Sequence, residues 1–404
     1  MRRLALLLLV AWTVLPCCAS RRVTVERLEQ LIAGAHGKTD ADVAERLSGL
    51  ELTERLSEAE VDRLRASLPG VKSQLTLVAI ADASAFLSPP AHEIVSAPGP
   101  GNAAQRQMLD LTVDYAGKAL SRLPNFFATR ETTLFMDAPV TAAYGTLAIF
   151  QSLEPAAKSS ATVLYRGGKQ VADAVGTNGS KSGSVEVGLI TSGEFGPMLG
   201  TVLSDAAQGT VAWSRWEQGD HGQEAVFRYT VPKEKSHYDV KFCCVSMKGG
   251  RSVFQRLSGY HGEIAIDPET GTILRLTMQA DLKPAYPMAR ADLMVEYGPV
   301  EIGGKTYTCP QRSIASARGY EPEPPSGRAN AGPLNFSGML GSQSAPDPTA
   351  SVPEVLQTLL NHVVFREYHL FRSDARILPG DDTELDRNPP ASEPEPVPVT
   401  APNY

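Results

Sequence analysis

The stretch YHGEIAIDPETGTILRLTMQADLKPAYPMARADLMVEY, residues 260–297, decides the fold class. Its apolar and β-branched runs predict three consecutive strands, over residues 260–267, 273–282 and 288–297. Between the first two runs, Pro268 presets φ and Gly271 permits a positive φ, which predicts a hairpin turn over residues 267–271. The stretch contains no recognised catalytic motif. It therefore predicts antiparallel strand order and register, and no activity.

Strand patterns continue on both sides of this stretch. Gly303-Gly304 leads into a strand-like segment over 305–314, and an earlier segment over 125–136 alternates in the same way. From residue 144 onward turns recur at the short spacing of a meandering sheet. Alternation in residues 224–231 predicts a sheet with one apolar and one wet face. Residues 353–362 predict a helix, and 363–371 predict a last strand.

Helical spacing dominates the first part of the chain. Residues 20–88 predict a small helical subdomain. A Pro- and Gly-rich linker over residues 89–102 is expected to join this subdomain to the rest of the chain and to allow relative motion between the two. A longer helix is expected over 104–123. The α+β domain is expected over 103–378, with a long loop at 320–350. The acidic, Pro-rich tail 379–404 is predicted to be disordered.

The first residues have the three parts of a secretory signal peptide. Arg2 and Arg3 precede an apolar run, and small residues end at Ala19, so a signal peptide is predicted over residues 1–19. Lipid attachment at Cys18 is the alternative to soluble export. No later stretch reaches the roughly 20 apolar residues of a membrane helix. We therefore expect a periplasmic or extracellular protein whose mature chain has no integral membrane span.

The charge balance makes nucleic acid an unsuitable partner. Removal of Arg2 and Arg3 leaves 36 basic residues from the original 38, against 45 acidic residues, a formal charge of −9. An acidic chain without a basic patch binds nucleic acid poorly.

Three cysteines remain after the predicted signal peptide. Cys243 and Cys244 point to opposite faces of a predicted strand, so one of them can reach Cys309. An oxidising compartment favours one disulfide, for which we predict Cys244 and Cys309. The alternative is that all three are small buried hydrophobic residues.

The order of elements resembles a known family. A helix passes through Leu123-Pro124-Asn125-Phe126 into strands, and the meander contains residues 267–271 and Val295-Glu296-Tyr297-Gly298-Pro299. This arrangement resembles exported bacterial proteins with a sheet like that of the periplasmic lipoprotein-carrier (LolA-like) family. The resemblance covers about residues 104–378. It implies a curved antiparallel half-barrel around a packed helix, with a concave apolar face for acyl chains or an envelope partner.

Motifs for catalysis, cofactors and metals are missing from the sequence. Gly37-Lys38-Thr39 and Gly304-Lys305-Thr306 lack the upstream glycine of a phosphate-binding loop. The seven histidines are scattered singly without metal-ligand spacing. His261, Glu263 and Asp267 share one strand face, as a polar cluster or as a solvated surface. We predict no catalytic residue, cofactor or metal site.

Six aromatic residues are the candidates for a ligand groove on the sheet. An apolar concave surface suits a lipid-like ligand, and the alternative is a core beneath a helix. The six are Trp213, Trp216, Phe227, Tyr229, Tyr238 and Phe242. The leading hypothesis is a non-enzymatic exported binding protein that holds an apolar or lipid-like ligand or an envelope partner. The alternatives are a protein-interaction module that uses residues 23–87 and a hydrolase whose site is assembled by the fold.

Overall fold

The computed structural model describes residues 20–137, 140–141, 152–171, 187–191, 193–220, 222–247, 250–283, 288–322 and 354–371. The predicted signal peptide, residues 323–350 of the predicted long loop, and the predicted tail lie outside these ranges. All of the described residues belong to one compact unit of the chain.

Residues 20–88 form a helical subdomain. Its elements are β1 (Arg21–Val23), α1 (Val25–Ala33), α2 (Asp40–Ser48), β2 (Leu50–Leu52), α3 (Glu58–Arg65) and α4 (Val71–Ala83). The hydroxyl oxygens of Thr24 and Thr39 cap α1 and α2 by accepting backbone hydrogen bonds from Arg27 and Asp42. Apolar residues at helical spacing fill its interior, and β1 pairs with β2 in parallel.

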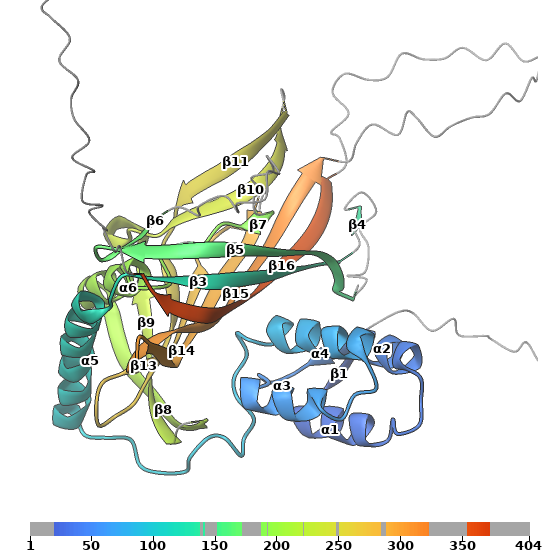
Figure 1. The fold of residues 1–404 in the computed structure, drawn as a ribbon, viewed down its shortest axis with the longest axis horizontal. Helices are drawn as coiled ribbons and strands as arrows, with labels where there is room; N and C mark the ends of the chain where they lie inside the picture. The colour runs from blue at the N-terminus through green and yellow to red at the C-terminus, as the bar shows by residue number, and fades with distance from the viewer. Residues whose placement is uncertain are drawn as a thin grey trace, which may run out of the picture. The chain divides into compact units, whose positions relative to one another are not determined.

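A large antiparallel sheet follows the helix α5 (Asn102–Arg122) (Figure 1). Its hydrogen-bonded order is β6-β5-β3-β16-β15-β14-β13-β12-β9-β8, and β4 pairs with β16. The strand bounds are β3 (Phe126–Met136), β4 (Val140–Thr141), β5 (Glu154–Arg166), β6 (Lys169–Val171), β8 (Thr210–Gly219), β9 (Gly222–Val231), β12 (Tyr260–Ile266), β13 (Ile273–Ala280), β14 (Met288–Ile302), β15 (Lys305–Pro322) and β16 (Glu354–Leu370). The sheet is curved and does not close into a barrel, which confirms the predicted α+β class.

A smaller sheet has the order β11-β10-β7. It consists of β7 (Gly188–Leu189), β10 (Asp239–Met247) and β11 (Gly250–Leu257). Helix α6 (Pro197–Gln208) precedes β8 in the chain and begins with a proline, whose fixed φ suits the first position of a helix.

The predicted hairpin turn over residues 267–271 forms between β12 and β13. The backbone N–H of Asp267 donates to the carbonyl of Thr272 over 2.9 Å, and Gly271 has a φ of +72°. A Cβ atom on Gly271 would lie 2.4 Å from the carbonyl carbon of Leu111 in α5. The turn therefore supports the helix as well as reversing the chain.

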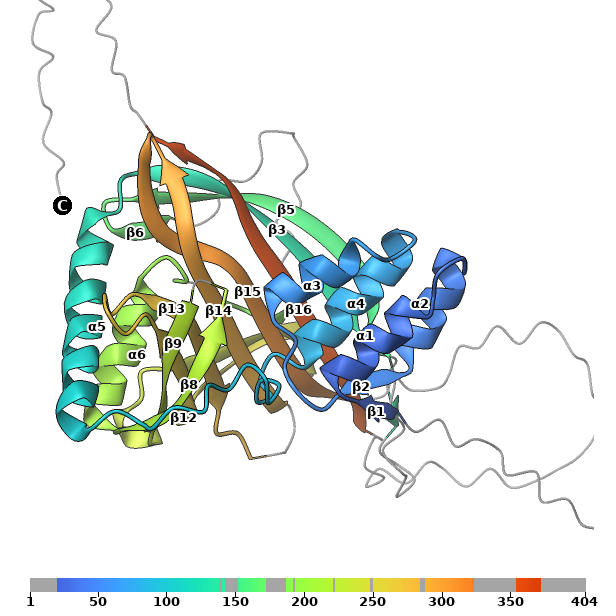
Figure 2. The same ribbon diagram turned by 90° about the horizontal axis from the view of Figure 1, so that it is seen from below.

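The central strands of the main sheet are buried on both faces. Leu293 and Val295 of β14 join a core cluster with Leu199 and Val202 of α6, whereas Met294 between them joins the core of the helical subdomain. Side chains alternate along a strand, so the two helical layers cover opposite faces. Figure 2 shows α5 and α6 together on one side and the helical subdomain, in blue, on the other. The expectation of one wet face is wrong for these strands, because the helical subdomain covers it.

Alternating burial also explains why the predicted helix over residues 353–362 is wrong. Residues 354–362 belong to the strand β16. Leu359 packs in the cluster under α6, and its neighbour Leu360 packs in the cluster of the helical subdomain. Consecutive apolar residues are buried on opposite faces of the sheet here. The alternation of apolar and polar residues that identifies a strand is therefore absent.

The predicted linker is hydrogen-bonded along the edge strand β8. Ile94 forms an antiparallel bridge with Glu217, and the backbone N–H of Gln218 donates to the carbonyl of Glu93 over 2.7 Å. The indole Nε1 of Trp216 donates to the carbonyl of Pro98 over 3.1 Å. The segment therefore covers an exposed strand edge and is not a free tether.

Candidate functional site

The six aromatic groove candidates lie in or against the hydrophobic core. Phe227, Tyr229 and Phe242 are 1%, 1% and 3% exposed, and Trp213, Trp216 and Tyr238 pack against the same cluster. Residues of α6 occupy the space over this face of the sheet. The candidates are therefore core residues and do not line an open groove.

The predicted disulfide between Cys244 and Cys309 is wrong. Cys309 is a free thiol with 0% exposure, and Cys243 is disulfide-bonded. The strand register also separates Cys243, the neighbour of Cys244, from Cys309. Cys243 of β10 lies opposite Gly188 of β7, and Gly188 lies close to Leu359 of β16. Leu359 in turn lies opposite Ala317 of β15. Eight residues of strand separate Ala317 from Cys309, about 25 Å at the usual rise, whereas the Cα atoms of a disulfide lie within about 7 Å.

The predicted polar cluster on β12 is divided between two contacts. Nδ1 of His261 lies 2.8 Å from Oδ1 of Asp281, whereas Glu263 pairs with Arg215. Asp267 accepts backbone hydrogen bonds within its own turn. These three residues therefore do not form a common site.

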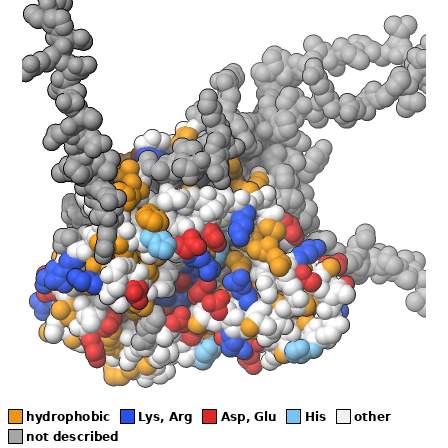
Figure 3. All heavy atoms as spheres, in the orientation of Figure 1, with side chains coloured by type: hydrophobic (Ala, Val, Ile, Leu, Met, Phe, Trp, Pro, Cys, Tyr) orange, Lys and Arg blue, Asp and Glu red, His pale blue; other side chains and the backbone are white. Residues whose placement is uncertain are grey.

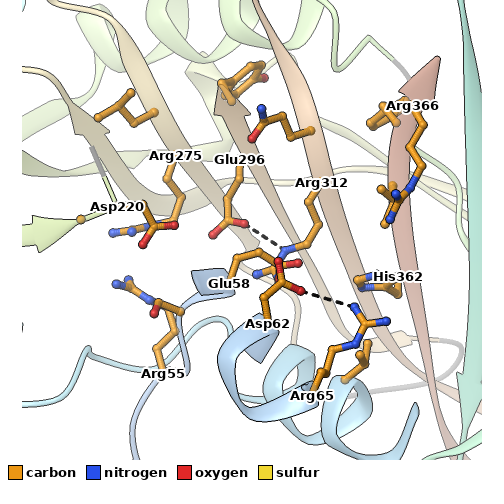
Figure 4. Close-up of a pocket in the computed structure, with 18 of the residues that line it drawn as sticks. Arg55, Glu58, Asp62, Arg65, Asp220, Arg275, Glu296, Arg312, His362 and Arg366 are labelled. Carbon is orange, nitrogen blue, oxygen red and sulfur yellow. Dashed lines mark ion pairs between the residues drawn. The ribbon is translucent and has the colours of Figure 1, made fainter. Parts of the chain in front are cut away.

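A cavity of about 560 Å³ lies between the helical subdomain and the outer face of the main sheet (Figure 4). The subdomain and the segment after it contribute Arg55, Glu58, Asp62, Arg65 and Glu93. Among the charged residues from the sheet are Glu217, Glu224, Arg275, Glu296, Arg312 and His362. Figure 3 shows acidic and basic side chains mixed on this side of the molecule. None of the six aromatic candidates is among the described residues that line the cavity.

Strand register creates a row of alternating charges along the floor of the cavity. Glu296 of β14 is paired directly with Arg312 of β15 on one side and with Arg275 of β13 on the other. Side chains opposite each other on neighbouring strands point to the same face. Nε of Arg312 lies 2.9 Å from Oε2 of Glu296, and Figure 4 shows this contact. Burial raises the pKa of Glu296 to about 7, against the opposing charges of Arg275 and Arg55.

Polar contacts join the helical subdomain to the sheet around the cavity, and three of them are short. Arg55 pairs with Glu217, and Glu58 pairs with Arg312. The third contact joins Asp82 of α4 to His362 of β16, with 2.8 Å between Oδ2 and Nδ1. Arg55, Asp82, Glu217 and Arg312 are all at most 5% exposed. The walls of the cavity are therefore held together by buried charges.

Glu217 is the most strongly compensated carboxylate of the site. Arg55, Arg215 and Arg275 all form ion pairs with it. Burial alone would raise the pKa of Glu217, but the charges of Arg275, Arg55 and Arg215 lower it to about 2. Arg215 also binds both carboxylate oxygens of Glu263, at 2.7 and 2.8 Å.

Glu224 is the least compensated buried carboxylate of the site. It is 6% exposed, and its Oε2 has no hydrogen-bond partner. The closest cation in an ion pair is Arg275, whose Nη1 lies 3.9 Å from Oε2. Burial raises the pKa of Glu224, and the negative charges of Glu217 and Asp220 add to this effect. Gly219 makes room for the side chain, because a Cβ at this position would lie 1.8 Å from Oε1 of Glu224.

Sequence reasoning did not identify this cavity, although part of a signal was present. Asp82 interrupts the apolar run Leu77-Val78-Ala79-Ile80-Ala81, and Arg275 interrupts Ile273-Leu274 and Leu276. A single charge inside an apolar run marks a buried charge that needs a partner. The identity of the partner is not local, since Asp82 meets a residue 280 positions away.

The described residues show neither a metal-binding cluster nor a spanning helix. No three His, Cys, Asp or Glu side chains in the described ranges are arranged to hold a metal ion. In the same ranges, no helix has the length and apolar character needed to cross a membrane.

Comparison with known proteins found no matching family model, curated protein or solved structure.

Proposed function

We propose that this chain is an exported binding protein that holds a small polar ligand in the cavity between the helical subdomain and the main sheet. The observation that supports the proposal is a cavity of about 560 Å³ whose lining includes buried charged groups, among them Glu224, whose carboxylate oxygen Oε2 has no hydrogen-bond partner. Burying a charge without a partner is costly, and such groups cluster at functional sites.

A polar ligand accounts for the site better than a lipid-like one. The resemblance to the lipoprotein-carrier family implies an apolar concave face that is open to a ligand. The six aromatic candidates on that face already pack in the core. The opposite face carries the cavity, and its lining includes the charged row of Arg275, Glu296 and Arg312. The proposal therefore keeps a binding role for the sheet and moves it to the other face.

The helical subdomain takes part in binding as one wall of the cavity. Ser57, Glu58, Asp62 and Arg65 line the cavity from α3 and the residue before it. The apolar residues of the subdomain, including Leu64 and Leu77, are buried in its own cluster. We therefore propose that this subdomain encloses a ligand, in preference to docking a partner through its apolar face.

Equilibrium dialysis tests the proposal. The purified protein is dialysed against a mixture of amino acids, aliphatic amines, dicarboxylic acids and sugar phosphates, and bound compounds are identified by mass spectrometry. We expect enrichment of at least one polar compound by the wild type. The variant Thr133→Trp, which places an indole in the cavity lining, should lose it. Val253→Trp, at a position 47% exposed on β11, is the control of similar size and should retain it. Failure to enrich any compound, or equal enrichment by both variants, would refute the proposal.

A further inference from the structure

The end of the cavity at the β8–β9 turn has more acidic than basic groups. Four carboxyl groups, from Glu93, Glu217, Asp220 and Glu224, share two guanidinium groups, from Arg55 and Arg275. With these six lining groups ionised, four negative and two positive charges leave an excess of two negative charges. Arg215 also pairs with Glu217 from outside the lining, but its guanidinium is balanced by Glu263, to which it donates at 2.7 and 2.8 Å.

Both of these arginines are already engaged by Glu217. Arg55 pairs with Oε1 of Glu217, and Arg275 donates to Oε1 and Oε2 over 3.0 and 3.2 Å. A guanidinium fork that binds one carboxylate in this manner has few donors left for a second carboxylate.

The other carboxylates lie beyond hydrogen-bond distance of these arginines. The ion-pair distance is 3.7 Å from Oε2 of Glu93 to Nη2 of Arg55, and 3.9 Å from Oε2 of Glu224 to Nη1 of Arg275. Neither distance is a hydrogen bond. Burial raises the pKa of both carboxyl groups, and the negative charge of Glu217 adds to the effect. This end of the cavity therefore lacks positively charged donors.

We infer that this end of the cavity binds the ammonium or guanidinium group of an organic cation, with the carboxylate of Glu224 as its main partner. The inference rests on the proposed function, because it names the ligand class of the same cavity. An ammonium group offers three donors, which can reach separate carboxylates. The described residues contain no cluster of metal-ligand geometry, so an organic cation fits better than a metal ion.

The opposite end of the cavity has the reverse character. Lys158 of β5 and Arg366 of β16 line it together with one carboxylate, Glu131 of β3, which leaves an excess of one positive charge. Both cations are exposed, and neither forms an ion pair within the described part of the chain. A ligand that carries an amine at one end and a carboxylate at the other would complement both ends. The amine is the part that Glu224 selects.

Isothermal titration calorimetry of the full chain at pH 8 tests the inference with three five-carbon probes. They are 1,5-diaminopentane, 5-aminopentanoate and glutarate, which differ in charge and little in length. We expect both amines to bind and glutarate not to bind. Glu224→Gln should weaken amine binding by at least about tenfold, because a charge-assisted hydrogen bond is lost. Asp220→Asn, at the exposed turn, should weaken it in the same direction. Glu301→Gln, at an exposed position on β14, should bind like the wild type.

The outcomes separate this inference from the proposed function. Binding of glutarate without binding of either amine would overturn the inference while keeping a polar binding site. Unchanged amine affinity in both Glu224→Gln and Asp220→Asn would also overturn it, since the cation would then lie elsewhere. If none of the three probes binds, the inference is wrong, and the dialysis experiment decides separately whether the cavity binds any polar compound.

Discussion

Nδ1 of His362 lies 2.8 Å from Oδ2 of Asp82, across 280 residues of chain. Asp82 is in the last turn of α4 and 1% exposed, and His362 is in the centre of β16. The pair connects the helical subdomain to the strand that lies between β3 and β15. The residues on either side of Asp82, Ala81 and Ala83, are apolar, and its partner comes from the sheet.

Asp82→Asn should loosen the helical subdomain from the sheet. The substitution removes the negative charge beside His362 and Arg312, and a hydrogen bond to a charged group contributes about 1.5–3 kcal/mol. We expect the free energy of unfolding, measured with urea, to fall by about that amount. Asp62→Asn is the matched control, because its side chain is 67% exposed. Equal losses in the two variants would contradict a special role for the buried pair.

The side chain of Arg312 should contribute far more to the free energy of unfolding when its acidic partners are present than when they are replaced. Its side chain is 6% exposed and pairs with Glu58 and Glu296. Arg312→Met leaves the carboxyl group of Glu296, whose side chain is 22% exposed, without this partner, and loss of a hydrogen bond to a charged group costs about 1.5–3 kcal/mol. The double variant Arg312→Met, Glu296→Gln should recover part of the loss. A thermodynamic cycle from chemical unfolding measures the coupling, and simple additivity of the two single variants would contradict the pairing.

The buried carboxyl group of Glu224 should make the ligand-free protein less stable as the pH rises. Its pKa is raised above the ordinary value of 4.5, chiefly by burial, so the folded protein binds more protons than the unfolded chain above this pH. The free energy of unfolding then decreases as the pH rises from about 4.5 toward the raised pKa. Glu224→Gln should flatten this part of the profile in urea titrations between pH 4 and pH 8. Glu301→Gln should leave the slope unchanged, and an unchanged slope in Glu224→Gln would contradict the prediction.

Gly271→Ala should detach α5 from the β12–β13 turn. The new Cβ would lie 2.4 Å from the carbonyl carbon of Leu111. The alanine would also have to adopt the left-handed backbone of Gly271, at a φ of +72°, which alone costs about 1–2 kcal/mol. Gly304→Ala is the control, because Gly304 has a φ of +78° and no atom within 4 Å of the added Cβ. We expect faster hydrogen exchange over residues 102–122 in Gly271→Ala alone. Similar exchange in the two variants would indicate that backbone strain, and not the contact with α5, causes the loss.

Local turn chemistry explains which parts of the fold were predictable. The turn at residues 267–271 and the Gly303-Gly304 hairpin are encoded by neighbouring residues, and both form as predicted. The sequence pattern predicts a helix in the first half of the strand β16, because Leu359 and Leu360 are buried against different layers and so remove the alternation. Whether the apolar face of the sheet is open or filled depends on α6, which the sequence pattern does not position.

The cavity was not predictable from the sequence because its pairs are distant in the chain. Arg55 meets Glu217, and Glu58 meets Arg312, only after the helical subdomain packs on the outer face of the sheet. The spacing of apolar residues indicates which side chains are buried, but it does not indicate which buried charges meet. Single charges within apolar runs, such as Asp82 and Arg275, are the feature that sequence reasoning could have used.

The rate at which the thiol of Cys309 reacts with a labelling reagent reports how often the sheet opens around it. Its thiol is fully buried beside Phe126 and Tyr165, and burial raises its pKa to about 12. A maleimide or iodoacetamide reagent should therefore label it at the rate at which this aromatic cluster opens, because the protected thiol is unreactive. The cluster shares no residue with the core of the helical subdomain. Labelling times would thus reveal whether the two regions open together or one after the other.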